Sequence, residues 1–443
     1  MTERNQTSRT AVRPARSRAA RVVIVGNSAA ALSALESFRE RDLEARVTMV
    51  SAEAGPAYSR VLLPYYLRRK LSYEGLFIRR PDYYARLKAR RVFGARVEGV
   101  DLDARRLDLA DGRHIAFDRL LLATGSSPAR PPVPGVDGPG IHHLWTLADA
   151  VGLDPLLQAD ARVLVLGSGF VALQAAWAAV QRGARVSVVE LEDQILPRVL
   201  DRQAARILHD EMTAHGVDVH TGTSIDGLQN SLSGAVVASA GGDDLVIADA
   251  VIVATGARPN DGLLPQCREE GRPGIPVSAM METGLDGVFA AGDVVRGPIA
   301  GGGPREIHAL WPTAVEQGKV AGANLAGAGL AYEGSLSMNV TEMFGLTVAS
   351  IGRFVENEGD DVHEWRDLEG IRYLKLVARL GVPAGAIALG DARGASLLGR
   401  LRPFVRHGRP MTDMRALFER KDLDMKLVGL RAEEEMTSCA SSS

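Results

Sequence analysis

The sequence contains two copies of one local pattern, in which a run of β-branched residues ends in a glycine-bearing turn. In each copy the tripeptide Ala-Thr-Gly follows the turn about 90 to 100 residues later. The turn at 26–31 is followed by the tripeptide at 123–125, and the turn at 167–172 by the tripeptide at 254–256. A buried strand, a tight turn and a helix together direct free amide groups and the positive end of the helix dipole at a phosphate. The duplication therefore predicts an α/β chain with two dinucleotide-binding domains.

The second turn matches the dinucleotide-binding pattern closely. Gly167 allows the tight turn, Gly169 allows the backbone to approach a pyrophosphate, and Ala172 lets the helix pack against the strand. Glu190 ends the next β-branched run, where its carboxylate can accept hydrogen bonds from both hydroxyls of an adenine ribose and would repel a 2′-phosphate. We therefore predict that this turn binds NADH and disfavours NADPH.

The first turn departs from that pattern, because Ser28 and Ala31 stand where the second and third glycines are usual. A serine hydroxyl can itself donate a hydrogen bond to phosphate, so the departure weakens the match without removing it. A lone turn of this kind is also typical of a helix that merely packs on a strand in any α/β domain. The repeated Ala-Thr-Gly favours the dinucleotide interpretation for both turns.

A third motif is the short apolar strand that starts at Gly287 and ends in Gly292-Asp293. With the two turns, it resembles the two-dinucleotide-binding flavoproteins of the pyridine nucleotide:disulfide oxidoreductase superfamily, over roughly residues 20 to 350. The resemblance implies that the first turn holds FAD and that an inserted second domain holds NADH. It also implies that Asp293 hydrogen-bonds the ribityl chain of the flavin.

The order of the motifs predicts an α/β chain with two nested Rossmann-like dinucleotide-binding domains and a smaller C-terminal α+β domain. Runs at 373–377 and 386–390 are typical of strands flanking a turn rich in glycine and proline. The resemblance implies that such a domain forms dimers or covers the flavin, which leaves a homodimer open. The predicted parts are a tail at 1–20 that is either disordered or a transit peptide, an FAD-binding domain at 21–150 and 271–330, an NADH-binding domain at 151–270, a C-terminal interface domain at 331–430 and a tail at 431–443.

Composition argues against several other classes of protein. The 443 residues carry a formal net charge of −2, which argues against nucleic-acid binding. The longest apolar run is interrupted by Gly167, Gly169 and Gln174, so it falls short of the roughly 18 residues of a membrane-spanning helix. We therefore expect no membrane span and a cytoplasmic protein. His142-His143 has no matching cysteine or histidine cluster, so no metal site is predicted.

Glu53 and Arg60 follow the β-branched run at 46–51 and extend the predicted FAD site. Glu53 is either the acid that binds the ribose of FAD or an exposed loop acid. Arg60 resembles the arginine of a Tyr-x-Arg segment in the NADH-binding region of nitrite reductase, where it helps to hold FAD; a surface ion pair is the alternative. The full set of predicted cofactor-binding residues is Gly26, Ser28, Ala29, Ala30, Glu53, Arg60, Thr124, Gly125, Gly167, Gly169, Phe170, Val171, Glu190, Gly256, Gly292, Asp293 and Trp311.

The segment 59–66 separates possible chemistries. It resembles the Cys-Gly-Leu-Pro-Tyr-Tyr segment of coenzyme A-disulfide reductases, but Val61 stands where their redox cysteine lies. Chemistry like that of glutathione reductase needs a Cys-x4-Cys pair beside the flavin, and the chain has only Cys267 and Cys439. We therefore predict electron transfer without a protein disulfide.

Three residues are candidate catalytic residues. Related ferredoxin reductases and NADH oxidases carry a lysine and a glutamate where this chain has Tyr65 and Gln174, and losing both charges together avoids leaving a lone buried charge. Both are predicted in the flavin–nicotinamide pocket, with ordinary packing as the alternative. His308 precedes a helix whose N-terminus, by resemblance, points at the flavin. It is either a proton donor or a structural residue. The structural role is favoured, because hydride transfer from NADH to FAD needs no protein acid.

These features predict an FAD-dependent NADH oxidoreductase. The segment 58–66 most resembles flavoprotein components that feed iron-sulfur systems, such as the nitrite reductase NADH-binding region and the FAD subunit of phenylglyoxylate dehydrogenase. The chain has no iron-sulfur cysteine cluster, so a separate iron-sulfur protein is the predicted acceptor. The basic runs at 68–70 and 79–80 are either its docking face or an ordinary solvated surface. A self-sufficient reductase of oxygen, a quinone or a disulfide, and a flavin- and NADH-binding redox sensor, remain alternatives.

Overall fold

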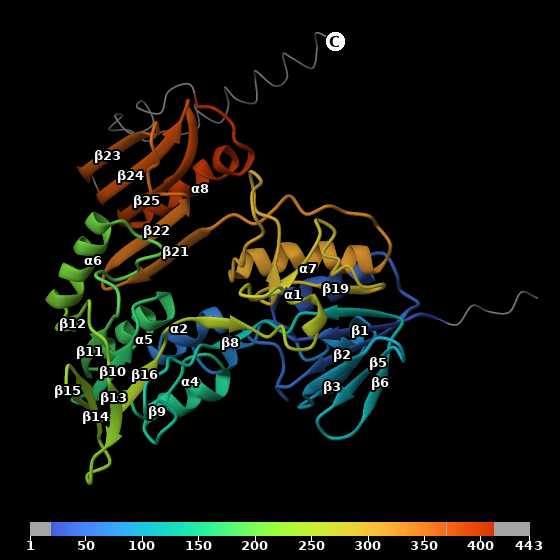
Figure 1. Ribbon diagram of the computed structural model, residues 1–443, viewed down its shortest axis with the longest axis horizontal. Coiled ribbons are helices and arrows are strands. Elements are labelled where there is room, and N and C mark those ends of the chain that lie inside the picture. The colour runs from blue at the N-terminus through green and yellow to red at the C-terminus, as the bar shows by residue number, and fades with distance from the viewer. Residues whose placement is uncertain (1–18, 369, 412–443) are drawn as a thin grey trace, which may run out of the picture.

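The computed structural model describes residues 19–368 and 370–411. The predicted tail at 431–443, nearly all of the tail at 1–20 and the end of the predicted C-terminal domain lie outside this range. Within it, two α/β domains lie side by side, and an antiparallel third domain lies over the second of them (Figure 1). The fold class predicted from the sequence is thus confirmed.

The first nucleotide domain is built on a five-stranded parallel sheet in the order β19-β7-β1-β2-β3. The apolar run of β1 is buried throughout, as expected for a central parallel strand with both faces covered. The strands are β1 (Arg21–Val25), β2 (Arg46–Ser51), β3 (Ala89–Phe93), β7 (Arg119–Leu122) and β19 (Val288–Ala290).

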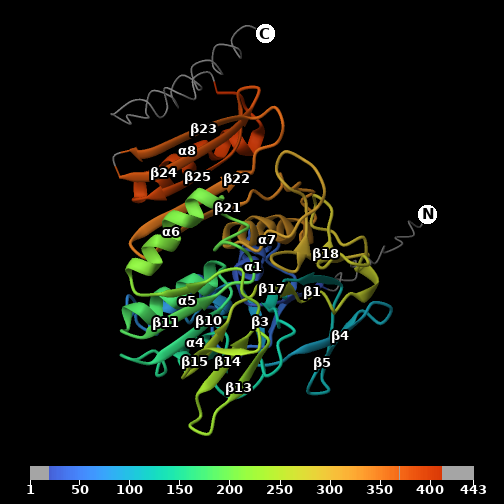
Figure 2. The ribbon, with the colours of Figure 1, turned by 60° about the vertical axis from the view of Figure 1, so that its left-hand side comes forward.

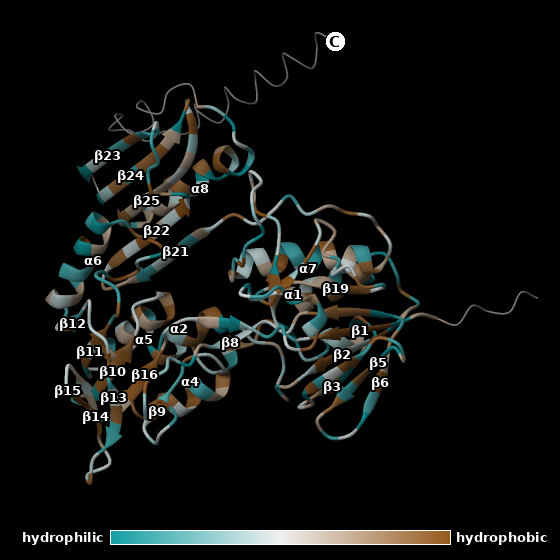
Figure 3. Ribbon diagram, viewed as in Figure 1, coloured by the Kyte–Doolittle hydropathy of each residue, from teal (hydrophilic) through white to brown (hydrophobic). Residues whose placement is uncertain are grey.

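The second nucleotide domain repeats this arrangement in the order β12-β11-β10-β16-β9, again all parallel. In both sheets the strand that leads into the glycine turn lies beside the strand that ends in Ala-Thr-Gly. Hydrophobic residues, coloured brown in Figure 3, run along the strands of both parallel sheets. The strands are β9 (Ile141–His142), β10 (Arg162–Leu166), β11 (Arg185–Val189), β12 (Asp218–His220) and β16 (Ala250–Val253).

A small antiparallel meander is inserted in each parallel sheet, between β3 and β7 in the first and between β12 and β16 in the second. These two insertions account for the long spacing between each glycine turn and its Ala-Thr-Gly. The first is β4 (Val97–Asp101), β5 (Arg106–Leu109) and β6 (His114–Ala116), and the second is β13 (Gly227–Asn230), β14 (Val236–Ala240) and β15 (Asp243–Ala248).

The chain passes between the two domains on a pair of short antiparallel strands, β8 (Ser126–Pro128) and β17 (Ala257–Pro259). Each begins directly after an Ala-Thr-Gly, so both tripeptides lie at this crossing. A second short pair, β18 (Ile275–Pro276) and β20 (Val295–Arg296), brackets the Gly-Asp strand.

Helices α1 and α7 pack very closely in the first nucleotide domain. A Cβ atom at Gly318 would lie 2.3 Å from the carbonyl oxygen of Ala30, and one at Gly322 would lie 2.2 Å from that of Ala34. Only glycine permits this approach. The helices are α1 (Ala29–Arg39), α2 (Leu63–Leu67), α3 (Tyr83–Arg86), α4 (Leu147–Leu153), α5 (Phe170–Gln181), α6 (Arg202–Ala214), α7 (Trp311–Leu325) and α8 (Ala392–His407).

The C-terminal domain is a five-stranded antiparallel sheet in the order β21-β22-β25-β24-β23, with α8 against one face. The predicted strands at 373–377 and 386–390 exist, but both are longer, and Pro383 lies inside β25 instead of in the turn. It is tolerated there because the register between β24 and β25 shifts where Ala378 lies opposite Pro383. The strands are β21 (Met338–Met343), β22 (Leu346–Gly352), β23 (Asp361–Leu368), β24 (Ile371–Arg379) and β25 (Val382–Gly390).

The other face of the C-terminal sheet shares one apolar core with both nucleotide domains. Figure 2 shows this sheet directly above α6. The core joins Leu67 of α2, Trp177 of α5, Met212 of α6, and Phe344 and Leu389 of the C-terminal domain. The C-terminal domain therefore packs against both nucleotide domains of its own chain. Within the described residues, no helix is long and apolar enough to cross a membrane.

Candidate functional site

The first glycine turn is held against its Ala-Thr-Gly by direct backbone contact. Gly26 has a φ of +135°, and a Cβ atom there would lie 2.2 Å from the carbonyl oxygen of Ala123. Ser28 is the N-cap of α1, yet its hydroxyl makes no capping hydrogen bond in the described part of the chain. The first turn of α1 therefore keeps its amide groups available, as a phosphate-binding turn requires.

The Gly-Asp motif reaches the same place from the far end of the domain. Gly292 has a φ of +83°, and a Cβ atom on it would lie 3.1 Å from the Cβ of Ala30. Its amide donates to Oε1 of Gln317 on α7 at 2.9 Å. The structure thus brings together the predicted residues Gly26, Ala30 and Gly292, which are up to 266 positions apart in the sequence.

Asp293 lies half-buried next to this junction. The Ser126 hydroxyl donates to its Oδ2 at 2.8 Å. Burial raises the pKa of the Asp293 carboxyl, while the Ser126 hydrogen bond and the charge of Arg60 oppose that shift. A half-buried carboxylate that accepts a side-chain hydrogen bond from Ser126 suits a ligand that brings further hydroxyl groups, as a ribityl chain does.

Arg60 and Glu53 form an ion pair, with Nη2 of Arg60 2.6 Å from Oε1 of Glu53. The Tyr58 hydroxyl donates to the other oxygen of Glu53 at 2.6 Å. Arg60 also donates from Nη1 to the carbonyl oxygen of Trp145 at 2.5 Å. Glu53 is therefore neither a free loop acid nor wholly available to ribose, and its role toward FAD stays a prediction.

Trp145 and Ser126 were missed by the sequence prediction. Trp145 donates from Nε1 to the carbonyl oxygen of Ser126 at 3.0 Å, and Ser126 in turn bonds Asp293. A continuous chain of contacts thus links Glu53, Arg60, Trp145, Ser126 and Asp293. Ser126 directly follows the first Ala-Thr-Gly, which was the one available signal in the sequence.

Asn260 ties the first Ala-Thr-Gly to the second crossing strand. Its side-chain amide donates to the carbonyl oxygen of Thr124 at 2.9 Å, and the Thr124 hydroxyl donates to the Asn260 carbonyl at 3.0 Å. The backbone amide of Asn260 also donates to the Gly125 carbonyl at 2.9 Å. Thr124 and Gly125 therefore anchor the crossing between the domains. Gly256 lies at the start of that crossing with a φ of +118°.

The second glycine turn repeats the geometry of the first. Gly167 has a φ of +97°, and a Cβ atom on it would lie 2.7 Å from the carbonyl oxygen of Ala254. Gly169 is the N-cap of α5, and a Cβ atom there would meet no described atom within 4 Å. The open side of Gly169 leaves room for a pyrophosphate. Phe170 and Val171 then begin α5, which presents its N-terminal amides to that side.

Glu190 folds back onto this turn. Its Oε2 accepts from the Ser168 amide at 2.8 Å and from the Ser168 hydroxyl at 2.5 Å, while its Oε1 accepts from the Glu192 amide at 2.9 Å. Ser168 was not predicted as a site residue. These contacts fix the carboxylate beside the turn and leave acceptor capacity on Oε1 for a ribose hydroxyl.

Tyr65 and Gln174 lie on the neighbouring helices α2 and α5. Gln174 is only 6% exposed, and its Nε2 donates to Oγ1 of Thr341 at 2.5 Å and to the Glu342 carbonyl at 2.8 Å. The guanidinium of Arg68 lies 5.4 Å from the Tyr65 ring centroid. The structure therefore places a strand of the C-terminal domain against Gln174, a contact that the sequence prediction did not include.

His308 and Trp311 flank the start of α7. Nε2 of His308 lies 3.2 Å from a carboxylate oxygen of Glu306, while its Nδ1 is buried without a hydrogen-bond partner among residues 19–368 and 370–411. Trp311 is the first residue of α7 and packs against the core of the first domain. The Glu306 contact orients the imidazole, as the structural interpretation of His308 requires.

The predicted basic docking runs are partly used inside the molecule. The Arg68 side chain is 3% exposed, so it is not part of a solvated face. Arg69 pairs with Asp154 at 2.9 Å, and Arg79 pairs with Glu36 at 3.0 Å. These ion pairs reduce the positive charge that the two runs offer to an acidic partner.

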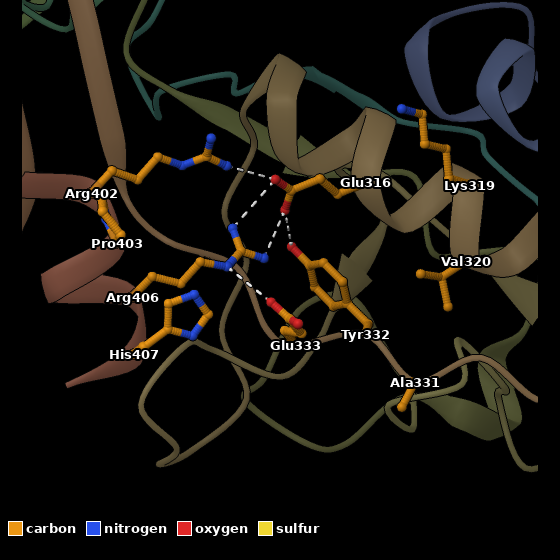
Figure 4. Close-up of a pocket in the computed structure, with 10 residues that line it drawn as sticks. All are labelled: Glu316, Lys319, Val320, Ala331, Tyr332, Glu333, Arg402, Pro403, Arg406 and His407. Atoms are coloured by element: carbon orange, nitrogen blue, oxygen red, sulfur yellow. Dashed lines mark hydrogen bonds and ion pairs between the residues drawn. The ribbon is translucent and has the colours of Figure 1, made fainter. Parts of the chain in front are cut away.

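A pocket of about 540 Å³ lies between α7 and α8, away from both glycine turns (Figure 4). Arg402 and Arg406 of α8 reach across it to Glu316 of α7, at 2.8 and 3.2 Å. The Tyr332 hydroxyl donates to Glu316 at 3.3 Å, and Arg406 also lies 3.5 Å from Glu333. These contacts join the C-terminal domain to the first nucleotide domain across the pocket.

Neither cysteine nor metal chemistry has support in the described residues. Cys267 is a free cysteine whose Sγ lies 3.9 Å from the Thr283 carbonyl, and burial raises the pKa of its thiol. No group of three or more histidine, cysteine, aspartate or glutamate residues that could hold a metal occurs within the described ranges.

Comparison with known proteins agrees with the geometry of the two turns. A family model described as pyridine nucleotide-disulphide oxidoreductase matches residues 20–318. The NADH-dependent phenylglyoxylate dehydrogenase subunit epsilon of Aromatoleum evansii is 35% identical over 358 residues, which are 80% of this chain and 84% of that protein. Rhodocoxin reductase of Rhodococcus erythropolis is 31% identical over 70% of this chain and 73% of its own length.

A solved structure shows the same fold. The NAD-dependent persulfide reductase from A. fulgidus superposes with a TM-score of 0.82 and 24% identity, and the match covers 94% of this chain and 84% of that one. The cofactors are FAD and NADH, and the protein is an FAD-dependent oxidoreductase. The match over residues 20–318, the relatives at 31% and 35% identity and the two nested nucleotide domains show that the chain belongs to the pyridine nucleotide-disulphide oxidoreductase family.

Proposed function

We propose that the protein is an electron-transfer flavoprotein component, which takes a hydride from NADH and passes electrons to a separate iron-sulfur protein. The observation that carries this proposal is Val61, which is 56% exposed and stands where disulfide-reducing relatives have their redox cysteine. Electrons that leave the flavin then have no protein thiol to enter at this position. The names of the relatives, a subunit of an NADH-dependent dehydrogenase and a rhodocoxin reductase, support the same role.

The residues of the first nucleotide domain fit FAD. In this proposal the first turn of α1 binds the pyrophosphate, and Asp293 accepts hydrogen bonds from the ribityl hydroxyls. Arg60 is oriented for the flavin by Glu53 and Trp145, and Trp311 begins the helix whose positive end faces the cofactor. Bound FAD supplies the chemistry that accepts two electrons from NADH and releases them singly.

The second nucleotide domain fits NADH. Gly169 leaves space for the pyrophosphate, and Glu190 presents an acceptor to the adenine ribose while disfavouring a 2′-phosphate. Tyr65 and Gln174 lie where α2 and α5 meet, and we propose that the nicotinamide lies there. His308 acts in this scheme as a structural residue held by Glu306.

An anaerobic titration of the purified protein tests this function. NADH should bleach the flavin stoichiometrically and NADPH should do so only at much higher concentration. Addition of an oxidised ferredoxin should restore the flavin absorbance within seconds, and oxygen or a quinone should do so far more slowly. Rapid, sustained turnover with oxygen or a quinone alone would instead identify a self-sufficient reductase, and a preparation without FAD that ignores NADH would refute the whole proposal.

Several further features are also proposals. We propose the domain division 21–150 with 271–330, 151–270 and 331–430. The strand order of the two parallel sheets supports it except at β9, which pairs with β16 and so belongs to the second sheet although it precedes residue 151. A homodimer and a cytoplasmic location stay predictions, which sedimentation analysis and fractionation of cells would test.

A further inference from the structure

The side chain of Arg68 is buried at the point where all three domains meet. It directly follows the last residue of α2, and its side chain is only 3% exposed. Its guanidinium lies between two aromatic rings, with Cζ 5.4 Å from the ring centroid of Tyr65 and 5.7 Å from that of Trp177 on α5. Glu342 of β21 lies on a third side. A unit positive charge is thus enclosed by α2, α5 and the edge of the C-terminal sheet.

The positive charge of Arg68 is only partly compensated. Its Nε donates to Oε1 of Gln181 at 2.7 Å, which is a neutral acceptor. The Glu342 carboxylate lies 3.7 Å from Nη2, beyond hydrogen-bond distance, and it is 60% exposed, so water screens it. Nη1 is buried and has no hydrogen-bond partner among residues 19–368 and 370–411. Because a guanidinium stays protonated in proteins, the charge persists, stabilised chiefly by the faces of the two rings.

This charge lies beside the proposed nicotinamide site. Tyr65, whose ring the guanidinium faces, is one of the two residues assigned to that site. The other is Gln174, whose Nε2 donates to the backbone carbonyl of Glu342 at 2.8 Å, and the side chain of Glu342 faces Arg68. One intervening residue therefore separates the guanidinium from each of the two. A buried charge acts over such a separation with little screening, because almost no water lies between.

We propose that Arg68 makes the site distinguish the two redox states of the nicotinamide, by disfavouring the positively charged ring of NAD⁺ relative to the neutral ring of NADH. This inference rests on the proposed function, because it requires a nicotinamide where α2 and α5 meet. Loss of a hydride to the flavin turns the neutral ring into the charged one. Repulsion by Arg68 would then favour release of the product and oppose the reverse transfer.

The test compares two ligands that differ in the charge of the ring. One is NAD⁺, and the other is the tetrahydro analogue of NADH, whose ring is neutral and cannot donate a hydride. Titration calorimetry on the oxidised, FAD-loaded protein gives the ratio of the NAD⁺ dissociation constant to that of the analogue. In Arg68→Met this ratio should fall about three- to tenfold below the wild-type value, the effect of one charge acting across a side chain. ADP-ribose, which lacks the nicotinamide, should bind the variant and the wild type equally.

Three further variants separate charge from packing. Arg68→Lys keeps the charge and should keep most of the wild-type ratio. Glu342→Gln removes the nearest opposing charge and should raise the ratio. Arg185→Met is the matched control, because it removes an exposed positive charge at the end of β11 remote from Glu190. That variant should keep the wild-type ratio.

Each outcome supports or overturns the inference. An unchanged ratio in Arg68→Met overturns it. An equal loss in Arg68→Lys also does so, since it would assign the effect to the shape of the guanidinium instead of its charge. A lower ratio in Glu342→Gln contradicts the electrostatic argument. If Arg68→Met does not fold, Arg68→Gln replaces it and is judged by the same ratio. If the FAD-loaded wild type binds neither NAD⁺ nor the analogue, it is the proposed function that fails.

Discussion

Replacing Gly318 by alanine would show whether the close approach of α7 to α1 shapes the FAD turn. The new Cβ would lie 2.3 Å from the carbonyl oxygen of Ala30 and 2.9 Å from its Cα. Both are backbone atoms, so the two helices have to move apart. Because Ala30 also faces Gly292, the movement would displace the first turn of α1 from the Gly-Asp motif.

The expected magnitude follows from two opposing effects. Alanine in a helix interior is about 1 kcal/mol more favourable than glycine. Forcing an extra methyl group into a packed interface costs about 1–3 kcal/mol, and a backbone contact well under 3 Å belongs at the upper end of that range. We therefore expect Gly318→Ala to lose about 1–2 kcal/mol in the free energy of unfolding.

Two other glycines provide comparisons. In Gly322→Ala the new Cβ would lie 2.2 Å from the carbonyl oxygen of Ala34, so the free energy of unfolding should fall by a similar amount. This substitution lies farther from Gly292. Gly399 is exposed in α8, and a Cβ atom there would meet no described atom within 4 Å, so Gly399→Ala should gain about 1 kcal/mol from helix propensity alone.

Urea unfolding of the FAD-free and FAD-loaded proteins measures these differences, and fluorescence titration measures FAD affinity. Gly318→Ala should weaken FAD binding more than Gly322→Ala, because it acts directly on Ala30. If Gly318→Ala is as stable as Gly399→Ala and binds FAD like the wild type, the close packing of α1 and α7 does not shape the site.

Three further predictions concern single side chains. Glu190→Ala should raise the NADPH to NADH ratio of kcat/KM at least about tenfold in steady-state assays, because the ribose acceptor and the charge that opposes a 2′-phosphate are both removed; an unchanged ratio would contradict the assignment. Burial raises the pKa of Asp293, so its ionised form destabilises the FAD-free fold as pH rises above about 4. FAD-free Asp293→Asn should therefore be more stable than the wild type in urea at pH 7, equal to it below about pH 4, and weaker in binding FAD; equal stability at pH 7 would contradict this reasoning. Tyr373→Phe removes the donor to Asp201 at 2.7 Å and should lower the free energy of unfolding by about 1 kcal/mol in thermal melts, with no change in FAD affinity if the contact serves only to attach the C-terminal domain.

The sequence predicted those parts of the site that depend on local backbone geometry. Gly26 and Gly167 are required by tight turns with positive φ, and the structure places each against the alanine of its Ala-Thr-Gly. The Gly-Asp motif was assigned to the first domain through the family resemblance. In the structure the strand that carries it, β19, lies in the same sheet as β1, and Gly292 lies against Ala30.

Other parts of the site were not predictable from local patterns. Trp145 acts through its backbone carbonyl and its indole N–H, and neither property has a sequence signature. Gln174 was predicted in the flavin–nicotinamide pocket, with packing as the alternative. Its amide hydrogens bind a strand 167 residues later, a contact that only the folded sheet edge reveals. The sequence suggested that Arg68 is a surface charge. In the structure its guanidinium lies between Tyr65 and Trp177, and such burial depends on tertiary packing, which the local sequence does not reveal.

The apolar core that joins Leu67, Trp177 and Phe344 has a consequence for protein engineering. A nucleotide domain whose apolar core lies entirely within it can be exchanged as a unit. Here the second domain shares its core with α2 from the first domain and with β21 and β22 from the C-terminal domain. A chimera that transfers residues 151–270 alone would expose apolar surface on both sides of every junction. A transplant of NADH specificity should therefore carry α2 and the C-terminal sheet along with it, or change only side chains around Glu190.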